Sequence, residues 1–399
     1  MRERPWWILP VIIVSQFAGT SLWFAGNVII GDLPAAWKID PHAVGAVTSA
    51  VQLGFIVGTF VFAVIALADR FSPRIIFFLC SLFGAVANLS ALVVVDNLSS
   101  LLAVRFVTGI FLAGIYPIGM KIAAGWYREG LGKALGFLVG ALVLGTASPH
   151  LVQSLGLAAG WRFVVFSTSM SSAAGGILVL LFVPNGPNAA VSPRLNLRAL
   201  NVIFGVREVR ASVFSYFGHM WELYAFWAFT PFLLSAYSAA HPDQHLNTSF
   251  LSFCVIAVGT VGCVGGGVIS QRVWSARVAF GQLVASGLCC VLFPLFVGLS
   301  LFPFIVAMML WGIVVVGDSP QFSALTASFA PKELVGSALT IANCIGFAIT
   351  IASIQLTGWL TGLIPSTYIT LPLVFGPAVG LAFLWPLLGR TQASQSRPR

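Results

Sequence analysis

The chain is a succession of apolar stretches about twenty residues long, separated by short segments that hold nearly all of its charged residues. Continuous apolar runs of this length match helices that cross a membrane, whereas membrane strands alternate apolar and polar residues over about ten positions. We expect an all-α integral membrane protein. The twelve predicted transmembrane helices cover residues 7–30, 43–66, 75–95, 99–122, 131–155, 161–184, 211–237, 249–270, 278–299, 302–325, 334–358 and 366–389.

The pattern of the first six spans recurs in the last six. Glycine, isoleucine, glycine and proline in the fourth span are repeated 203 residues later in the tenth: Gly109, Ile110, Gly114 and Pro117 against Gly312, Ile313, Gly317 and Pro320. A duplicated six-helix unit of this kind is typical of secondary transporters, and an even number of spans per unit makes the two copies parallel repeats. We therefore predict two six-helix bundles, 1–184 and 211–399, joined by a linker at 185–210.

Composition and charge support this picture. Hydrophobic residues make up 58% of the chain and charged residues 8%, against about 25% charged residues in soluble domains. Most basic residues fall on the side that holds the termini and the linker, and only Lys38 and Arg162 lie on the other. The positive-inside rule then predicts a multi-pass protein of the inner (cytoplasmic) membrane with both termini in the cytoplasm. Because the net charge of +9 is scattered over short loops, it does not indicate nucleic-acid binding.

At this point the whole chain resembles the major facilitator superfamily. The loop after the second span, IALADRFSPR, matches the family pattern G-x-x-x-D-R-x-G-R-R/K at Asp69, Arg70 and Arg74 but has Ile65 and Ser72 where glycines are usual. Arg105, Gly109 and Gly114 in the fourth span are similar to the family's arginine-and-glycine signature. The resemblance implies two bundles that rock about a central site, with a gating loop at Asp69, Arg70 and Arg74 and a counterpart at Arg272.

Two acids lie well inside predicted spans, Glu222 in the seventh and Asp318 in the tenth, together with His219 and Arg105. A charge at the centre of a membrane helix costs about 2.5–3.5 kcal/mol on insertion scales, so such residues usually face a cavity or a partner. In the family that the chain resembles, spans 1, 4, 7 and 10 line the central cavity. We therefore place these four residues among the candidates for substrate binding or proton coupling.

His219 and Glu222 are three residues apart, so they share a helix face and can touch. Such a pair can exchange a proton near neutral pH, or it can simply fix the seventh span against its neighbours. In the first span the corresponding positions are Gly19 and Leu22, so the repeated scaffold does not require these charges. Arg105 keeps its charge and is a candidate anion site, although pairing with a neighbouring helix or with backbone carbonyls explains it equally well.

Polar and aromatic residues accompany these charges. Trp23, Tyr116, Tyr224 and Trp227 are candidates to line an apolar cavity with polar tips, with core packing as the alternative. Four amides are expected to hydrogen-bond across helices: Gln16, Asn27, Asn343 and Gln355. Pro117 and Pro320 are expected to bend the fourth and tenth spans.

These features predict a secondary active transporter that moves a small organic solute by alternating access and is coupled to protons. Arg105, with Lys121, favours an anionic metabolite, whereas the aromatic content favours efflux of a hydrophobic compound by proton antiport. A membrane receptor without transport is an alternative of another class. The six cysteines lie in apolar runs without metal-binding spacing. We expect no enzyme activity, metal or cofactor, and a monomer whose partners are its substrate, protons and lipid.

Overall fold

The computed structural model describes residues 5–33, 37, 39–40, 43–127, 130–156, 160–187 and 195–389; Lys38 therefore lies outside the described part. Every regular element in this part is a helix. The first half of the chain contains α1 (Ile8–Thr20), α2 (Ala25–Ile29), η1 (Ile30–Asp32), α3 (Val44–Val64), α4 (Leu67–Arg70), α5 (Pro73–Leu89), α6 (Ala91–Val94), α7 (Leu98–Leu112), α8 (Tyr116–Trp126), α9 (Leu131–Leu155) and α10 (Gly160–Phe182). The second half contains α11 (Arg198–Gly205), α12 (Arg207–Ala240), α13 (Thr248–Ala257), α14 (Gly259–Val273), α15 (Ser275–Val297), α16 (Leu301–Gly317), α17 (Ser319–Phe329), α18 (Val335–Leu360), η4 (Ser366–Tyr368), η5 (Leu371–Val374), α19 (Phe375–Leu384) and η6 (Trp385–Leu387).

The helices confirm the predicted all-α membrane fold. Within the described residues, ten helical segments are long and apolar enough to cross a membrane, and the bent pair of α1 with α2 and η1 makes an eleventh. The remaining predicted span is α12, which has 34 residues. Its middle carries His219 and Glu222, which makes it more polar than the other spans.

The repeated glycines have the same structural role in both halves. A Cβ on Gly109 would collide with the carbonyl oxygen of Val51, and one on Gly312 would collide with that of Val255. These contacts join α7 to α3 in the first half and α16 to the α13–α14 span in the second. Small residues at helix crossings allow backbones to approach closely in membranes. The glycines that recur in the sequence therefore mark the same helix crossing in both halves.

Four of the described spans are interrupted near their middle, the α13–α14 span at Val258 among them. α1 and α2 meet at an angle of 42°. α7 ends at Leu112 and α8 begins at Tyr116, immediately before Pro117, while α16 ends at Gly317 and α17 begins at Ser319, immediately before Pro320. Proline fits the first turn of a helix because its missing N–H needs no partner there. The predicted bends at Pro117 and Pro320 are therefore confirmed as helix breaks.

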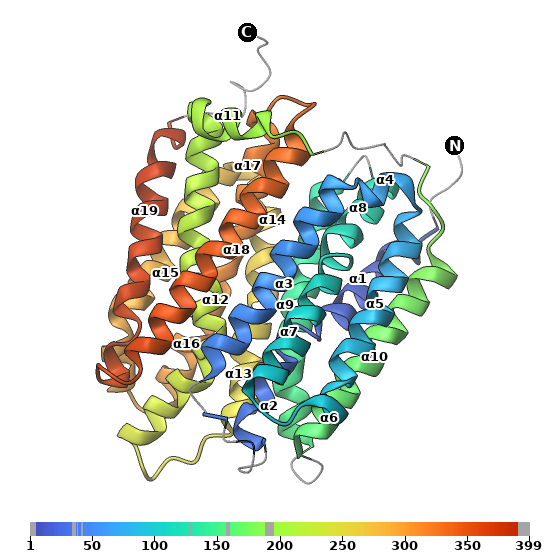
Figure 1. Cartoon of the computed structure of the whole chain (residues 1–399). Helices are drawn as coiled ribbons and strands as arrows, with labels where there is room; N and C mark the ends of the chain where they lie inside the picture. The colour runs from blue at the N-terminus through green and yellow to red at the C-terminus, as the bar shows by residue number, and fades with distance from the viewer. Residues whose placement is uncertain are drawn as a thin grey trace.

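Figure 1 shows two helical groups side by side, with α4, α8 and α11 at one end of the molecule and α2 and α6 at the other. α3 lies against α18 and α9 lies against α13 and α14, so each bundle contributes two spans to the interface. The predicted linker 185–210 contains a short helix, α11, which packs on α12 and α18 through Ala199 and Ile203. α12 begins at Arg207, four residues before the predicted start of the seventh span.

Candidate functional site

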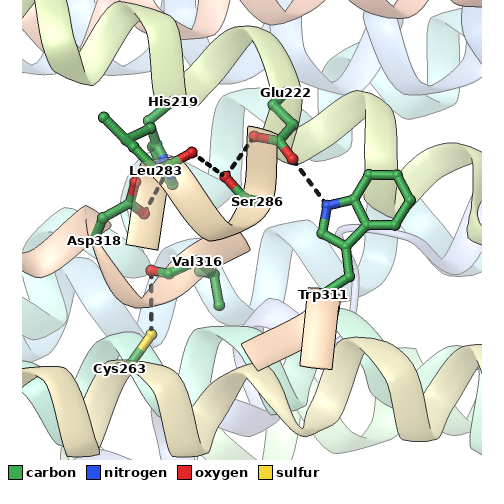
Figure 2. Close-up of polar contacts among 8 residues, drawn as sticks. All are labelled: His219, Glu222, Cys263, Leu283, Ser286, Trp311, Val316 and Asp318. Carbon is green, nitrogen blue, oxygen red and sulfur yellow. Dashed lines mark hydrogen bonds and ion pairs between the residues drawn. The ribbon is translucent and has the colours of Figure 1, made fainter. Parts of the chain in front are cut away.

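A buried pair of titratable side chains joins α12 to the break between α16 and α17. His219 Nδ1 lies 2.8 Å from Asp318 Oδ1, and both side chains are 1% exposed. Asp318 is the single residue between the two helices, and the ring of His219 packs near those of Tyr216 and Phe322. Figure 2 shows the two side chains pointing toward each other. Nε2 of His219 has no partner among the described residues, so the imidazole retains a free nitrogen.

Glu222 lies one helical turn further along α12 and has other partners. Its carboxylate accepts hydrogen bonds from Ser286 Oγ at 2.9 Å and Trp311 Nε1 at 2.8 Å (Figure 2), and from Cys290 Sγ at 3.3 Å. Ser286 and Cys290 belong to α15, whereas Trp311 belongs to α16. A carboxylate can accept several hydrogen bonds at once, so Glu222 ties α12 to two neighbouring helices.

His219 and Glu222 do not contact each other. The predicted contact rested on their spacing along one helix, but each side chain turns to a partner on another helix. Asp318 holds His219 at the α16–α17 break, while Ser286 and Trp311 hold Glu222. The prediction of a touching pair is wrong, because contacts between helices outweigh the weak interaction of neighbours on one helix face.

The first bundle has apolar contacts at the equivalent places. Gly19, the counterpart of His219, lies against Ile115, so that a Cβ on the glycine would be 2.6 Å from Ile115 Cγ2. Ile115 precedes α8 as Asp318 precedes α17, 203 residues later. Leu22, the counterpart of Glu222, packs near Gly84 of α5. One fold therefore accepts either an apolar or a charged contact between these helices.

Arg105 is buried inside the first bundle at the break between α1 and α2. Its guanidinium donates to the carbonyl oxygens of Leu22 at 2.8 Å and Trp23 at 2.6 Å, and to Asn88 Oδ1 at 3.0 Å. Carbonyls at a helix end lack partners within the helix, and a cation is favoured near that end. Arg105 therefore supports the broken first span, and these contacts match the alternative role that the sequence left open.

Aromatic rings from both bundles meet where they face each other. The ring of Trp23 lies 5.5 Å from that of Phe347, 5.9 Å from that of Tyr224 and 4.8 Å from that of Phe55. Trp227 contacts Tyr224, with ring centroids 5.2 Å apart. We call these five residues the ring cluster. All five are buried, and the indole N–H groups of Trp23 and Trp227 have no hydrogen-bond partner among the described residues.

Of the remaining predicted residues, Tyr116 interacts electrostatically with Tyr224 of the ring cluster, whereas the four gating-loop residues lie elsewhere. Tyr116 begins α8 and packs partly buried against the main core. The side chain of Asp69 lies outside the described part of the chain, whereas Arg70 and Arg272 are exposed. Arg74 Nε is buried and has no partner within the described part. The structure thus does not bring Arg70 and Arg272 to the central positions, and their assignment to a gating loop stays a prediction.

Sequence reasoning missed several partners of these residues. Ser286, Cys290 and Trp311 bind Glu222, while Phe55 and Phe347 complete the ring cluster. Serine, cysteine and phenylalanine are common in membrane helices, and nothing in their spacing marks these five. The only signal in the sequence is the span on which each of these residues lies. The repeat predicts that these spans pack beside the first or the seventh span.

Comparisons with known proteins agree with this architecture. Residues 10–354 match the family model described as Major Facilitator Superfamily. A solved structure of a mutant of the nucleoside transporter NupG is similar with a TM-score of 0.68, covering 96% of this chain and 100% of that chain at 15% identity, which is a likeness of fold. A Schizosaccharomyces pombe protein described as an uncharacterized transporter is 28% identical over 166 residues. That alignment covers 38% of this chain and 30% of the yeast protein.

Proposed function

Because this chain belongs to the major facilitator superfamily, we propose that it is a secondary active transporter that moves a small organic solute by alternating access and couples this movement to protons. The observation that carries the proposal is the buried His219–Asp318 pair at the break in the α16–α17 span. Ionisable residues inside membrane helices commonly belong to proton or substrate pathways.

The location of this pair supports a role in coupling. When His219 is protonated and Asp318 is ionised, their attraction joins α12 to the α16–α17 break. A proton gained by Asp318, or lost by His219, removes that attraction. In the first bundle, Gly19 and Ile115 occupy the equivalent positions and pack without charges. Charged side chains are therefore not needed to pack these helices. Protonation of the pair can therefore change the fit between α12 and a broken span that is already able to bend.

The contact of Glu222 with α15 depends on protonation in a similar way. Three donors from two helices surround its carboxylate, so that both oxygens serve as acceptors when Glu222 is ionised. A proton on Glu222 would turn one acceptor oxygen into a donor and leave a neighbouring N–H or O–H without its partner. The packing of α12 against α15 and α16 would then depend on whether Glu222 holds a proton.

For the substrate, the ring cluster favours an uncharged planar molecule with hydrogen-bond acceptors. Its rings come from both bundles, and the two unpaired indole N–H groups offer donors in an apolar setting. The anionic metabolite that the sequence favoured stays a prediction that now rests on Lys121 alone, because Arg105 is held by carbonyl oxygens. Proton-driven efflux of a hydrophobic compound is a second candidate, supported by the same rings.

The test is transport by the purified protein in liposomes against a panel of solutes, with and without an imposed pH gradient. The panel should pair uncharged heterocycles, with nucleosides as the first probes, against carboxylates of similar size. We expect an uncharged member to accumulate only when the gradient is present. Accumulation of a carboxylate would contradict the proposed substrate class, and accumulation unaffected by the gradient would contradict proton coupling.

Neutral variants test the coupling residues directly. In Glu222→Gln and Asp318→Asn, gradient-driven accumulation should fall to background, because neither side chain can release a proton, while exchange of labelled for unlabelled solute should stay within about threefold of the wild type, roughly 0.7 kcal/mol. Asp243→Asn, which changes an exposed acid between α12 and α13, is the matched control. Full gradient-driven accumulation in both buried variants would remove these residues from the coupling mechanism.

A further inference from the structure

A row of polar side chains on α15 runs from Glu222 to the break between α16 and α17. Gln282, Ser286 and Cys290 follow one another at intervals of four residues and so share a helix face. Ser286 and Cys290 donate to Glu222. At the other end of this polar row, Gln282 lies against Gly317, since a Cβ on that glycine would collide with Nε2 of the amide. Gly317 is the last residue of α16, so the amide of Gln282 lies at the break.

The first bundle makes the same contact without an amide. Cys80 of α5 lies 202 residues before Gln282, and a Cβ on Gly114 would collide with its Sγ. Gly114 is the repeat counterpart of Gly317. A free cysteine behaves as a small hydrophobic residue. The repeated scaffold therefore accepts a small thiol at the position where the second bundle places an amide.

A second pair of contacts supports this correspondence between α5 and α15. Gly84 of α5 lies against Leu22, so that a Cβ on the glycine would be 3.2 Å from Leu22 Cδ1. Ser286, 202 residues after Gly84, donates to Glu222, the counterpart of Leu22. Because both contacts follow one offset, α5 and α15 pack in the same way. Gln282 and Ser286 are thus additions of the bundle that carries the buried acids.

Two buried acceptor atoms near the break lack a donor. Oε1 of Gln282 and Oδ2 of Asp318 are both buried, and neither has a hydrogen-bond partner in the part of the chain that the structure describes. His219 lies against the other carboxylate oxygen. Buried acceptors without donors are unfavourable. A protonated carboxyl group carries one O–H donor, so a proton on Asp318 can satisfy both groups at once.

The other titratable neighbours of Asp318 are already engaged. Glu222 of α12 and Cys263 of α14 interact electrostatically with Asp318, in addition to His219. The carboxylate of Glu222 accepts its own hydrogen bonds from α15 and α16. The thiol of Cys263 donates to a backbone carbonyl of α16. The amide oxygen of Gln282 remains as an acceptor beside the break that can receive a hydrogen bond.

We propose that Gln282 is a positioning residue of the coupling site: when Asp318 takes up a proton and parts from His219, its O–H donates to the side-chain oxygen of Gln282. Asp318 then has a partner in each protonation state, on α12 when ionised and on α15 when protonated. The change of partner transfers the hold on the α16–α17 break from one helix to another. This inference rests on the proposed function, because it assigns the partner of the protonated form.

The carboxyl group of Asp318 can be followed directly by infrared titration of the purified protein. The C=O stretching band of a protonated carboxyl group disappears on ionisation, and the difference between the parent protein and Asp318→Asn identifies the band of Asp318. In Gln282→Leu, the titration midpoint of this band should fall by about one pH unit, tenfold in proton affinity, because a hydrogen bond to the neutral form favours protonation. The band should also move to higher frequency as that hydrogen bond is lost.

Two further variants complete the test. Gln282→Cys recreates the contact of Cys80 in the first bundle, so it should fold and show the same shifts if the leucine variant is unstable. Gln244→Leu, which removes an exposed amide between α12 and α13, is the matched control and should change neither the midpoint nor the frequency. An Asp318 band that is unchanged in Gln282→Leu and Gln282→Cys, or a midpoint that rises in them, would overturn the proposal. So would a parent protein without an Asp318 band at any pH at which it stays folded.

The infrared titration requires no transported solute, so its outcome is separate from that of the transport assay. Full gradient-driven accumulation in Asp318→Asn, together with the expected infrared shifts, would remove Asp318 from coupling but keep Gln282 as its partner. Lost accumulation in Asp318→Asn with an infrared band that ignores Gln282 would keep the proposed function and remove Gln282 from it.

Discussion

At the residue scale, the two halves of the repeat differ at one buried contact. Gly19 and Ile115 make an apolar contact in the first bundle, whereas the ionisable side chains of His219 and Asp318 meet in the second. Burial of two charges is expensive, and well-packed apolar residues of similar volume are often neutral or stabilising replacements. If both side chains are ionised, the pair is therefore not required for stability, in line with the proposed role in coupling.

This comparison leads to a prediction for a paired exchange. His219→Gly alone leaves Asp318 buried without a partner and should destabilise the protein by about 3–5 kcal/mol. Adding Asp318→Ile recreates the contact of the first bundle and should recover most of that loss. The apparent melting temperatures of the two variants in detergent measure the difference.

The double variant also separates structure from coupling. It should bind and exchange solute but fail to accumulate it with a pH gradient, because the titratable pair is gone. A double variant that is no more stable than His219→Gly would argue that the two repeats do not make equivalent contacts here.

At the scale of helices, the same glycine crossings hold a broken span against its neighbour in each bundle. Gly109 brings α7 against α3, and Gly312 brings α16 against the α13–α14 span. Arg105 adds a specific support to the broken first span by donating to the carbonyl oxygens of Leu22 and Trp23, between α1 and α2. The crossings hold α7 and α16, the first halves of their broken spans, against neighbouring helices.

Alanine at either crossing should be destabilising. Gly109→Ala and Gly312→Ala each place a Cβ against a backbone carbonyl, and overpacking of this kind typically costs about 1–3 kcal/mol. Gly132→Ala is the control, because a Cβ at that position of α9 meets nothing within 4 Å. Apparent melting temperatures should fall by several degrees for the two crossing variants and stay unchanged or rise for the control. Equal shifts in all three would contradict close packing at the crossings.

At the scale of the whole molecule, the candidate substrate site exists only because two bundles meet. The rings of Trp23 and Phe55 come from the first bundle, and those of Tyr224, Trp227 and Phe347 come from the second. Two Ser–Gln hydrogen bonds also join the bundles along this interface, Ser249 to Gln153 and Gln355 to Ser49. The proposed alternating access requires this site to open toward one end and then the other by a tilt of the two bundles.

Removal of one indole should weaken binding without unfolding the protein. Trp23→Leu loses a ring contact and an N–H donor, so the affinity for an uncharged planar solute found by the liposome panel should fall about tenfold or more. Trp385→Leu, which changes an indole that is 66% exposed, is the control. The dissociation constant can be measured by thermal stabilisation of the purified protein. An unchanged affinity in Trp23→Leu would place the substrate away from the ring cluster.

The sequence by itself determined the spans, the repeat and the family, because membrane helices need long apolar runs and duplicated helix crossings need glycines at fixed positions. It also singled out His219, Glu222, Asp318 and Arg105, since a charge inside an apolar run is visible without any structure. Only the tertiary structure decided their partners. Glu222 accepts hydrogen bonds from α15 and α16, and Arg105 donates to the backbone carbonyls at the break in the first span. These pairings depend on which faces of distant helices meet, and helical periodicity along one segment carries no information about the helix that will lie across from it.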